Sequence, residues 1–314
     1  MYIVTGGAGF IGSNLVRALL KSKQEEVIVV DNLVEGRKFL NIADSAISDY
    51  MDQGEFLSRI EKDRAFLSNI KCVFHQGACS DTTEWDGHYM MKNNFTYSKI
   101  LLHACLDQNV RFIYASSAAV YGSSMNFKEQ VENEKPLNVY GYSKLLFDQY
   151  VRKLKLTNKQ QVVGLRYFNV YGPRESHKGS MASVAYHFNK QIEAKGSANL
   201  FKGSHGYKDG EQQRDFIYVD DVCAVNLWFL LNSHISGIYN LGTGNPSSFN
   251  AVANAIINWH KKGNINYIDF PDDLENAYQS FTSADLDNFR RTGCDIEFSD
   301  INQGINQYLN YLSG

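Results

Sequence analysis

The 314-residue chain has little excess charge, few prolines and no long apolar run, and each shortage excludes something. The net charge of −3 comes without the basic stripe of a nucleic-acid-binding protein. No apolar run reaches the length of a membrane span, and the first expected strand begins too early to follow a signal peptide. The four prolines and the absence of a low-complexity linker leave topology as the only guide to domain boundaries.

Cysteine is also scarce and unpatterned. No C-x-x-C pair occurs, and the five cysteines are Cys72, Cys79, Cys105, Cys223 and Cys294. This odd, scattered set indicates reduced thiols in a cytoplasmic protein. His75 and Cys79 would share a face if their stretch were helical, but two ligands without a third do not make a metal site. We therefore expect no bound metal, and a strand end followed by a loop at this place.

What the chain does contain is an alternation of short apolar runs and longer helical patterns. The alternation predicts strands at residues 2–5, 26–30, 72–75, 112–115 and 162–167, with helices at 13–21, 93–108 and 140–154. Further helices are expected at 183–194 and 248–262, and strands at 216–219 and 237–241. Strands and helices that alternate in this way predict an α/β fold with a doubly wound parallel sheet.

The first strand leads directly into a glycine-rich turn. Gly6 allows a tight turn, Gly9 lets backbone approach a pyrophosphate, and Gly12 permits close packing of the next helix on the strand. The N-terminus of that helix offers unpaired N–H groups to phosphates. Asp31 ends the second strand, where an acidic side chain accepts hydrogen bonds from ribose hydroxyls. This context predicts a Rossmann-type, NAD(P)-binding domain.

Topology then suggests how the chain divides. We expect the dinucleotide-binding domain to span residues 1–168, with returning segments near 214–245. Residues 169–213 and 246–314 are expected to form a smaller α/β substrate-binding lobe over the carboxyl ends of the sheet.

The residues alone do not choose between NAD and NADP. Asp31 favours NAD, because a carboxylate accepts from both ribose hydroxyls. Arg37 and Lys38 follow closely, and they can neutralise a 2′-phosphate to which Asn32 can donate. A solvated basic loop would carry the same residues, so the choice stays open at this point.

Tyr140 and Lys144 are four residues apart, on one face of an expected helix. A phenol ordinarily has a pKa of about 10, and a neighbouring ammonium lowers that pKa by stabilising the phenolate. We therefore expect Lys144 to make Tyr140 a usable base. The hydroxyl of Ser117, at the end of an expected strand, can hold the oxygen of a substrate. With the glycine turn, this set predicts an enzyme that takes hydride from an alcohol carbon.

These motifs, in this order, resemble the extended short-chain dehydrogenase/reductase superfamily over essentially the whole chain. Residues 214–221 and 240–244 are similar to segments of its sugar-nucleotide enzymes, where an arginine at the position of Arg214 grips the substrate diphosphate. The 4,6-dehydratases of that group carry an acidic pair where this chain has Ala118 and Ala119. Alanine performs no acid/base chemistry, so a dehydratase is not expected.

Three longer strings, at residues 80–87, 89–94 and 174–184, resemble the ADP-heptose 6-epimerase family of bacterial lipopolysaccharide inner-core biosynthesis. This resemblance implies an isomerase that inverts C6 of ADP-D-glycero-D-manno-heptose through transient oxidation. It also implies one NADP per subunit, a nucleotide-sugar substrate and a homo-oligomer (typically a pentamer). From the charge, the apolar runs and the cysteines described above, we expect a cytoplasmic enzyme with no nucleic-acid or membrane partner.

The resemblance also assigns residues, position by position. The catalytic residues it implies are Tyr140, Lys178, Ser117 and Lys144. The cofactor contacts it implies, together with the glycine turn, are Gly6, Gly9, Phe10, Ile11, Gly12, Asp31, Asn32, Lys38, Gln53, Gln76, Gly77, Ala78, Cys79, Ser80, Asn93, Lys144, Val170 and Lys178. The substrate contacts it implies are Asn169, Ser180, His187, Phe201, Lys202, Gly203, Ser204, Arg214 and Tyr278.

At three places the chain departs from the relative used for this comparison. Gln53 stands for a lysine, Gln76 stands for a glutamate, and the loop at 206–213 is longer. The first two changes concern cofactor contacts, and the third lies near the expected substrate contacts.

Inversion at an exocyclic carbon requires that the oxidised arm rotates before hydride returns, which moves the oxygen across the pocket. Proton transfer needs heavy atoms within about 3 Å, so two acid/base groups are expected. The resemblance assigns them to Tyr140 and Lys178, whereas the residues alone would make Lys178 an exposed loop lysine. One alternative is another sugar-nucleotide epimerase or reductase, such as a UDP-hexose 4-epimerase. An alternative from a different class is a non-catalytic dinucleotide-binding sensor, which typically lacks the tyrosine or the lysine retained here.

Overall fold

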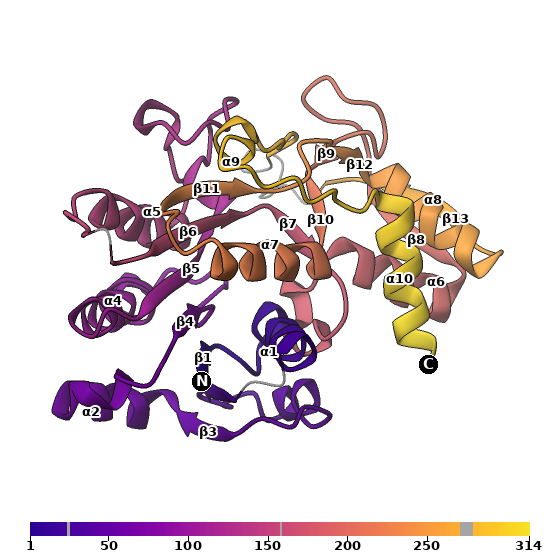
Figure 1. The fold of residues 1–314 in the computed structure, drawn as a ribbon. Helices are drawn as coiled ribbons and strands as arrows, with labels where there is room; N and C mark the ends of the chain where they lie inside the picture. Colours follow the sequence, from indigo (N-terminus) through magenta and orange to yellow (C-terminus); the bar gives the residue numbers. More distant parts are fainter. Residues whose placement is uncertain (24–25, 158, 271–278) are drawn as a thin grey trace.

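The computed structural model describes residues 1–314 except 24–25, 158 and 271–278. A seven-stranded parallel sheet forms its centre (Figure 1), with strand order β11-β6-β5-β4-β1-β2-β3. The strands are β1 (Tyr2–Thr5), β2 (Val27–Asp31), β3 (Asp49–Asp52), β4 (Cys72–His75), β5 (Arg111–Ser117), β6 (Val162–Tyr167) and β11 (Gly237–Leu241). The strand order reverses direction between β1 and β4, which is where doubly wound sheets bind ligands. The predicted fold class is confirmed.

Helices cover both faces of the sheet because its side chains alternate. Val4 of β1 packs with α1 (Phe10–Lys23) and α7 (Val219–Leu231), whereas its neighbour Ile3 packs with the helices of the opposite face. That opposite face carries α2 (Gln53–Lys62), α4 (Tyr97–Asp107) and α5 (Val139–Arg152). Three short segments also belong to the half of the molecule around the sheet: α3 (Gly87–Met91), a π-helical turn (Lys92–Thr96) and α9 (Asp287–Arg290).

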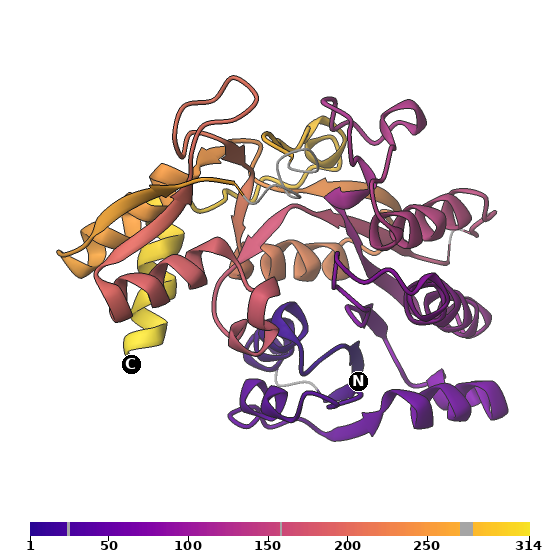
Figure 2. The same cartoon turned by 180° about the vertical axis from the view of Figure 1, so that it is seen from behind.

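A second hydrophobic core lies beside the sheet, at one end of the molecule (Figures 1 and 2). It joins α6 (Val184–Lys195), α8 (Phe249–His260) and α10 (Ile301–Ser313) to the parallel pair β8 (Ser197–Phe201) and β13 (Asn264–Ile268). Two smaller pairs lie between the cores: β7 (Asn169–Tyr171) with β10 (Phe216–Tyr218), and β9 (Gln213–Arg214) with β12 (Ser247–Ser248). The sequence assigns residues 246–314 to the smaller lobe, but Phe289 and Cys294 pack in the core of the large sheet.

Most expected elements occur within a few residues of their predicted bounds. The strand expected at 216–219 ends at Tyr218 because α7 begins at Val219. That helix is apolar on nearly all sides, so it shows no amphipathic stripe and the helical pattern did not reveal it. The helix expected at 93–108 begins with the π-helical turn. None of the helices in the described residues combines the length and apolar character that a bilayer crossing requires.

Candidate active site

The glycine turn between β1 and α1 is packed so tightly that side chains are excluded. Gly6 has a φ of +64°, and a Cβ on it would lie 2.7 Å from the backbone of Gly77. A Cβ on Gly12 would lie 2.1 Å from the carbonyl oxygen of Gly6. The α1 helix therefore begins directly at the cavity wall, and its N-terminus is suited to a pyrophosphate.

The end of β2 holds a carboxylate that is already paired with a cation. Asp31 accepts hydrogen bonds from the backbone N–H of Ala8 (3.0 Å) and from Nζ of Lys38 (2.5 Å). Lys38 also donates to Oδ1 of Asn32 (3.1 Å). Arg37, in contrast, is exposed and forms an ion pair with Glu35 (2.7 Å). Of the two cations expected near the ribose, Lys38 is the one fixed at the carboxylate.

A single cavity of about 1380 Å³ runs from the glycine turn to the second core. Pockets for one small ligand are usually about 300–1,000 Å³, so this cavity has room for a dinucleotide and a second ligand. Every catalytic and cofactor residue assigned from the sequence lines this cavity. The substrate residues that line it are Asn169, Ser180, Phe201 and Arg214.

The remaining substrate assignments lie outside the lining. Among the described residues, His187, Lys202, Gly203 and Ser204 do not line the cavity. His187 lies 3.4 Å from the carbonyl oxygen of Ser180, which does line it. The other three precede the loop at 205–211, and Ser204 contacts Gln212, a lining residue (3.3 Å). Tyr278 falls outside the described residues.

Several lining residues were missed by sequence reasoning. They include Thr82, Trp85, Asn138, His177, Phe249 and Thr282. Asn138 had a readable signal, since it precedes the helix that carries Tyr140 and caps it by accepting from the N–H of Gly141 (2.8 Å). Thr82, Trp85 and His177 lie within the strings at 80–87 and 174–184, which gave no role to these three residues. Phe249 and Thr282 come from segments with no motif of their own, so only the fold places them here.

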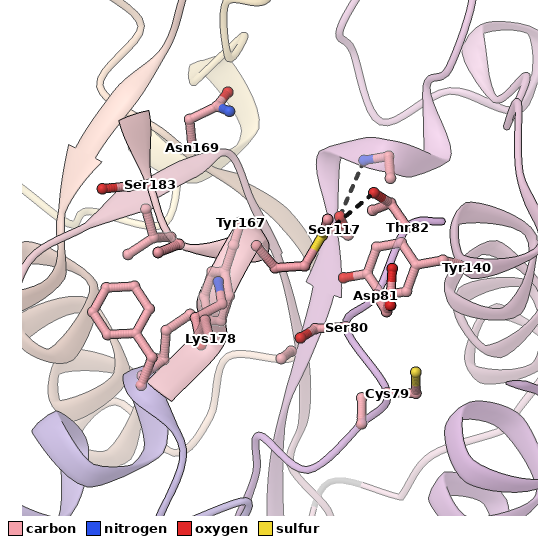
Figure 3. A pocket seen from close by; sticks show the side chains of 18 of the residues that line it. Cys79, Ser80, Asp81, Thr82, Ser117, Tyr140, Tyr167, Asn169, Lys178 and Ser183 are labelled. Atoms are coloured by element: carbon pink, nitrogen blue, oxygen red, sulfur yellow. Dashed lines mark hydrogen bonds between the residues drawn. The ribbon is translucent and has the colours of Figure 1, made fainter. Parts of the chain in front are cut away.

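One wall of the cavity carries Ser117, at the end of β5, and Tyr140, in the first turn of α5 (Figure 3). Lys144, one turn further along α5, also lines the cavity. Burial raises the pKa of the half-buried Tyr140, and a hydrogen bond with Ser117 opposes part of this rise. Nζ of Lys144 donates to the carbonyl oxygen of Ala115 (2.8 Å), and burial lowers its pKa to about 8. The sequence predicts that Lys144 lowers the pKa of Tyr140. In the structure the ammonium of Lys144 is bound to the β5 backbone instead, and the pKa of Tyr140 is raised.

The lowered pKa of Lys144 has a consequence for stability. In the unfolded chain its pKa returns to 10.5, so between pH 8 and 10.5 the unfolded state binds more protons than the folded state. The free energy of unfolding of the unliganded protein, relative to Lys144→Met, is therefore expected to rise with pH through that window. The total rise should be on the order of 3 kcal/mol. Urea denaturation at several pH values measures it.

The control for this prediction is Lys153→Met, because Lys153 is exposed at the end of the same helix. Its difference from the unsubstituted protein is measured over the same pH range as the baseline. A Lys144→Met difference that varies with pH no more than this baseline would show that burial does not perturb the Lys144 amine.

Lys178 lies on the opposite wall (Figure 3). It belongs to the 3₁₀-helical segment Ser176–Met181, and its Nζ lies 5.5 Å from the centre of the Phe10 ring at the start of α1. Burial lowers the pKa of this amine, whereas the negative charge of Glu175 opposes that effect. Tyr140 and Lys178 therefore face one cavity from two sides.

Arg214 lines the second half of the cavity, with its guanidinium 5.9 Å from the centre of the Phe249 ring. The next residue, Asp215, is fully buried and accepts from the N–H and hydroxyl of Thr243 (2.6 and 2.7 Å). It also accepts from the N–H groups of Gly244 (2.9 Å) and Ala284 (2.8 Å). This carboxylate explains why the motifs at 214–221 and 240–244 occur together.

An unpaired donor also fits a dinucleotide. The hydroxyl of Tyr167 accepts from Nδ2 of Asn226 (3.1 Å) and donates to Oε1 of Gln76 (3.1 Å). Nε2 of Gln76 is then a buried donor with no hydrogen-bond partner among the described residues. An acceptor atom of a ligand would satisfy it, and the glycine turn and Asp31 fit the same group. No cluster of three or more potential metal ligands occurs in the described part of the chain.

Comparison with known proteins agrees with a dinucleotide-binding site. The family model of the NAD-dependent epimerase/dehydratase family matches residues 2–242. An ADP-L-glycero-D-manno-heptose-6-epimerase of Alkalilimnicola ehrlichii is 57% identical over 313 residues, covering 100% of this chain and 98% of that protein.

Solved structures agree over the full length. The Helicobacter pylori ADP-L-glycero-D-manno-heptose-6-epimerase matches with a TM-score of 0.86 and 31% identity, covering 100% of this chain and 96% of that one. The Thermus thermophilus UDP-glucose 4-epimerase, solved in complex with NAD, matches with a TM-score of 0.80 and 26% identity, covering 100% and 99%. The chain therefore belongs to the NAD-dependent epimerase/dehydratase family.

Proposed function

We propose that this protein epimerises ADP-D-glycero-D-manno-heptose at C6, giving ADP-L-glycero-D-manno-heptose for the lipopolysaccharide inner core. The cofactor of this family is a nicotinamide dinucleotide, and the epimerase relatives act on nucleotide sugars. The observation that carries the proposal is the pair of titratable groups, Tyr140 and Lys178, on opposite walls of one cavity (Figure 3). The named relatives in A. ehrlichii and H. pylori support the substrate.

Burial prepares the two groups for complementary roles. The raised pKa of Tyr140 favours the protonated phenol, which is an acid. The lowered pKa of Lys178 favours the neutral amine, which is a base. In one direction of the reaction Lys178 takes the proton of the C6 hydroxyl and Tyr140 returns a proton on the other side of the cavity. In the reverse direction the roles exchange.

Other residues orient the reactants. Ser117, hydrogen-bonded to Tyr140, holds the alcohol oxygen on that wall. Arg214 grips the diphosphate through a charge-assisted hydrogen bond, and Asn169 and Ser180 contact the sugar. The bound dinucleotide supplies the hydride acceptor and donor. The two cores that meet at the cavity support a division into a dinucleotide-binding domain and a smaller substrate lobe.

We propose NADP as the dinucleotide, because Lys38 offsets the negative charge of Asp31 and places an ammonium donor at the ribose edge. Lys38→Met should weaken NADP binding by about 10- to 100-fold, since a charge-assisted contact contributes about 1.5–3 kcal/mol and Asp31 then faces the phosphate unpaired. NAD binding should change much less. Fluorescence titration with both dinucleotides measures the difference.

Arg37→Met provides the matched comparison, because Arg37 is exposed and paired with Glu35. It should weaken NADP binding less than Lys38→Met does. Equal losses for NAD and NADP in Lys38→Met would contradict a role at the 2′-phosphate.

The function itself is tested by incubation with ADP-D-glycero-D-manno-heptose and assignment of the C6 configuration by NMR. Parallel incubation with UDP-glucose and UDP-galactose tests the alternative 4-epimerase, and no turnover of any nucleotide sugar would favour a sensor. Denaturation releases the bound dinucleotide, which chromatography identifies as NADP or NAD.

Two further parts of the proposal concern the state of the protein. The resemblance supports a homo-oligomer, a pentamer, which light scattering of the purified protein tests. All five cysteines carry free thiols, as suits a cytoplasmic enzyme. Cell fractionation tests that location.

A further inference from the structure

The turn that carries Lys178 is attached to the dinucleotide-binding half by an arginine that does not line the cavity. Arg174 is 5% exposed and adopts a φ of +71°, a conformation that non-glycine residues rarely take. Its guanidinium donates to the carbonyl oxygen of Asn41 and to Oδ2 of Asp44 (2.6 Å). Asn41 ends the 3₁₀ helix Gly36–Asn41, which also contains Lys38. A buried guanidinium thus joins two segments more than a hundred residues apart.

Asn41 makes contacts in two directions. Its Nδ2 donates to the carbonyl oxygen of Ala8 in the glycine turn (2.9 Å) and lies 3.1 Å from Nδ1 of His177. On α1, Asn14 donates to the carbonyl oxygen of Pro173 (2.9 Å). Residues 173–177 are therefore docked on the backbone that surrounds the glycine turn.

The same turn is also closed on itself. The buried carboxylate of Glu175 accepts from the N–H and hydroxyl of Ser183 (2.5 and 2.7 Å) and from the N–H of Gly172 (3.3 Å). Glu175 therefore ties residues 172–183 into one hydrogen-bonded unit. The amine of Lys178 forms no ion pair within the described residues, so its place in the cavity follows from how this unit is docked.

We propose that Arg174 and Asn41 form a clamp that positions Lys178 against the dinucleotide-binding half. Neither residue lines the cavity, so Arg174 is a positioning residue that acts through Lys178. This inference rests on the proposed role of Lys178 as one of two acid/base groups. Without the guanidinium, the closed unit remains folded but is free to shift on the 3₁₀ helix, which moves the amine away from the alcohol oxygen.

The two half-reactions separate this role from a general structural one. Each purified epimer is mixed with excess enzyme, and reduction of the bound nicotinamide is followed by its absorbance within a single turnover. If Lys178 serves one alcohol configuration, Lys178→Met slows the oxidation of one epimer far more than that of the other. Arg174→Met should slow that same half-reaction by about 10-fold or more and the other by less than about 3-fold, since a displacement near 1 Å can reduce rates strongly.

His177→Leu is the second variant, because it removes the side-chain contact with Asn41 and leaves the guanidinium contacts of Arg174 in place. This variant should slow the same half-reaction selectively, but by a smaller factor than Arg174→Met. If Arg174→Met does not fold, the test rests on His177→Leu. Arg59→Met is the control. Arg59 lies on α2, its guanidinium packs over the Phe66 ring, and it does not line the cavity. Both of its half-reactions should be unchanged.

Two results would overturn the clamp in different ways. In the first, Lys178→Met slows one half-reaction far more than the other, but Arg174→Met and His177→Leu slow both half-reactions equally or slow neither. The clamp is then wrong and the two-group scheme stands. If Lys178→Met itself slows both half-reactions equally, the acid/base assignment fails, and the clamp fails with it.

Discussion

Tyr140→Phe is expected to reduce the turnover number for epimerisation by about 10²–10⁴-fold, the contribution usual for a positioned general acid or base. The substitution removes one hydroxyl from a half-buried ring and leaves no new charge or cavity. Burial raises the pKa of this hydroxyl, which favours its protonated form, and the hydroxyl also contacts Ser117. Without it, the substrate oxygen on this wall loses its proposed proton donor.

The measurement is turnover by NMR, together with the melting temperature and the content of bound dinucleotide, both of which should stay unchanged. Tyr142→Phe is the matched control, since Tyr142 lies two residues later on α5 and its side chain is 48% exposed. Turnover of Tyr140→Phe within tenfold of the unsubstituted enzyme would remove this residue from the mechanism.

Lys178→Met is expected to lose turnover to a similar extent, about 10²–10⁴-fold. Methionine keeps the length and apolar stem of lysine but has no proton to exchange. Because burial already lowers the pKa of this amine, replacing it with an apolar group should not destabilise the fold. Loss of one group should not be rescued by the other, since they stand on opposite walls (Figure 3).

The control here is Lys190→Met on α6, where the lysine is exposed and pairs with Glu193 (2.9 Å). Its turnover should match that of the unsubstituted enzyme. Should Lys178→Met retain most of its turnover, a single group must serve both positions of the oxygen, and the two-group scheme is wrong.

Local patterns predicted the dinucleotide half well. Gly12 is required by a neighbour in sequence, since a Cβ on it would meet the carbonyl oxygen of Gly6. The spacing of Tyr140 and Lys144 places both on one face of α5, as helix geometry requires. These features depend on contacts within a few residues, so a single sequence is enough to recognise them.

The pKa shifts of Tyr140 and Lys144 could not be predicted from the sequence in the same way. The spacing brings Lys144 near Tyr140, but the ammonium binds the Ala115 carbonyl of β5, a partner 29 residues away. Burial then decides the direction of both pKa shifts. Burial is a sum over many distant segments, so spacing on one helix cannot supply it.

The wall that carries Lys178 shows most clearly which features follow from local sequence and which follow from long-range packing. Short-range steric and helical rules in the sequence were sufficient for the parallel sheet, the dinucleotide turn and the tyrosine–lysine helix. The location of Lys178 came only from the folded chain, because its turn is held by Arg174 and Asn41, which are 133 residues apart. Contacts over such distances depend on how whole elements pack, and they determine where Lys178, the proposed second acid/base group, lies.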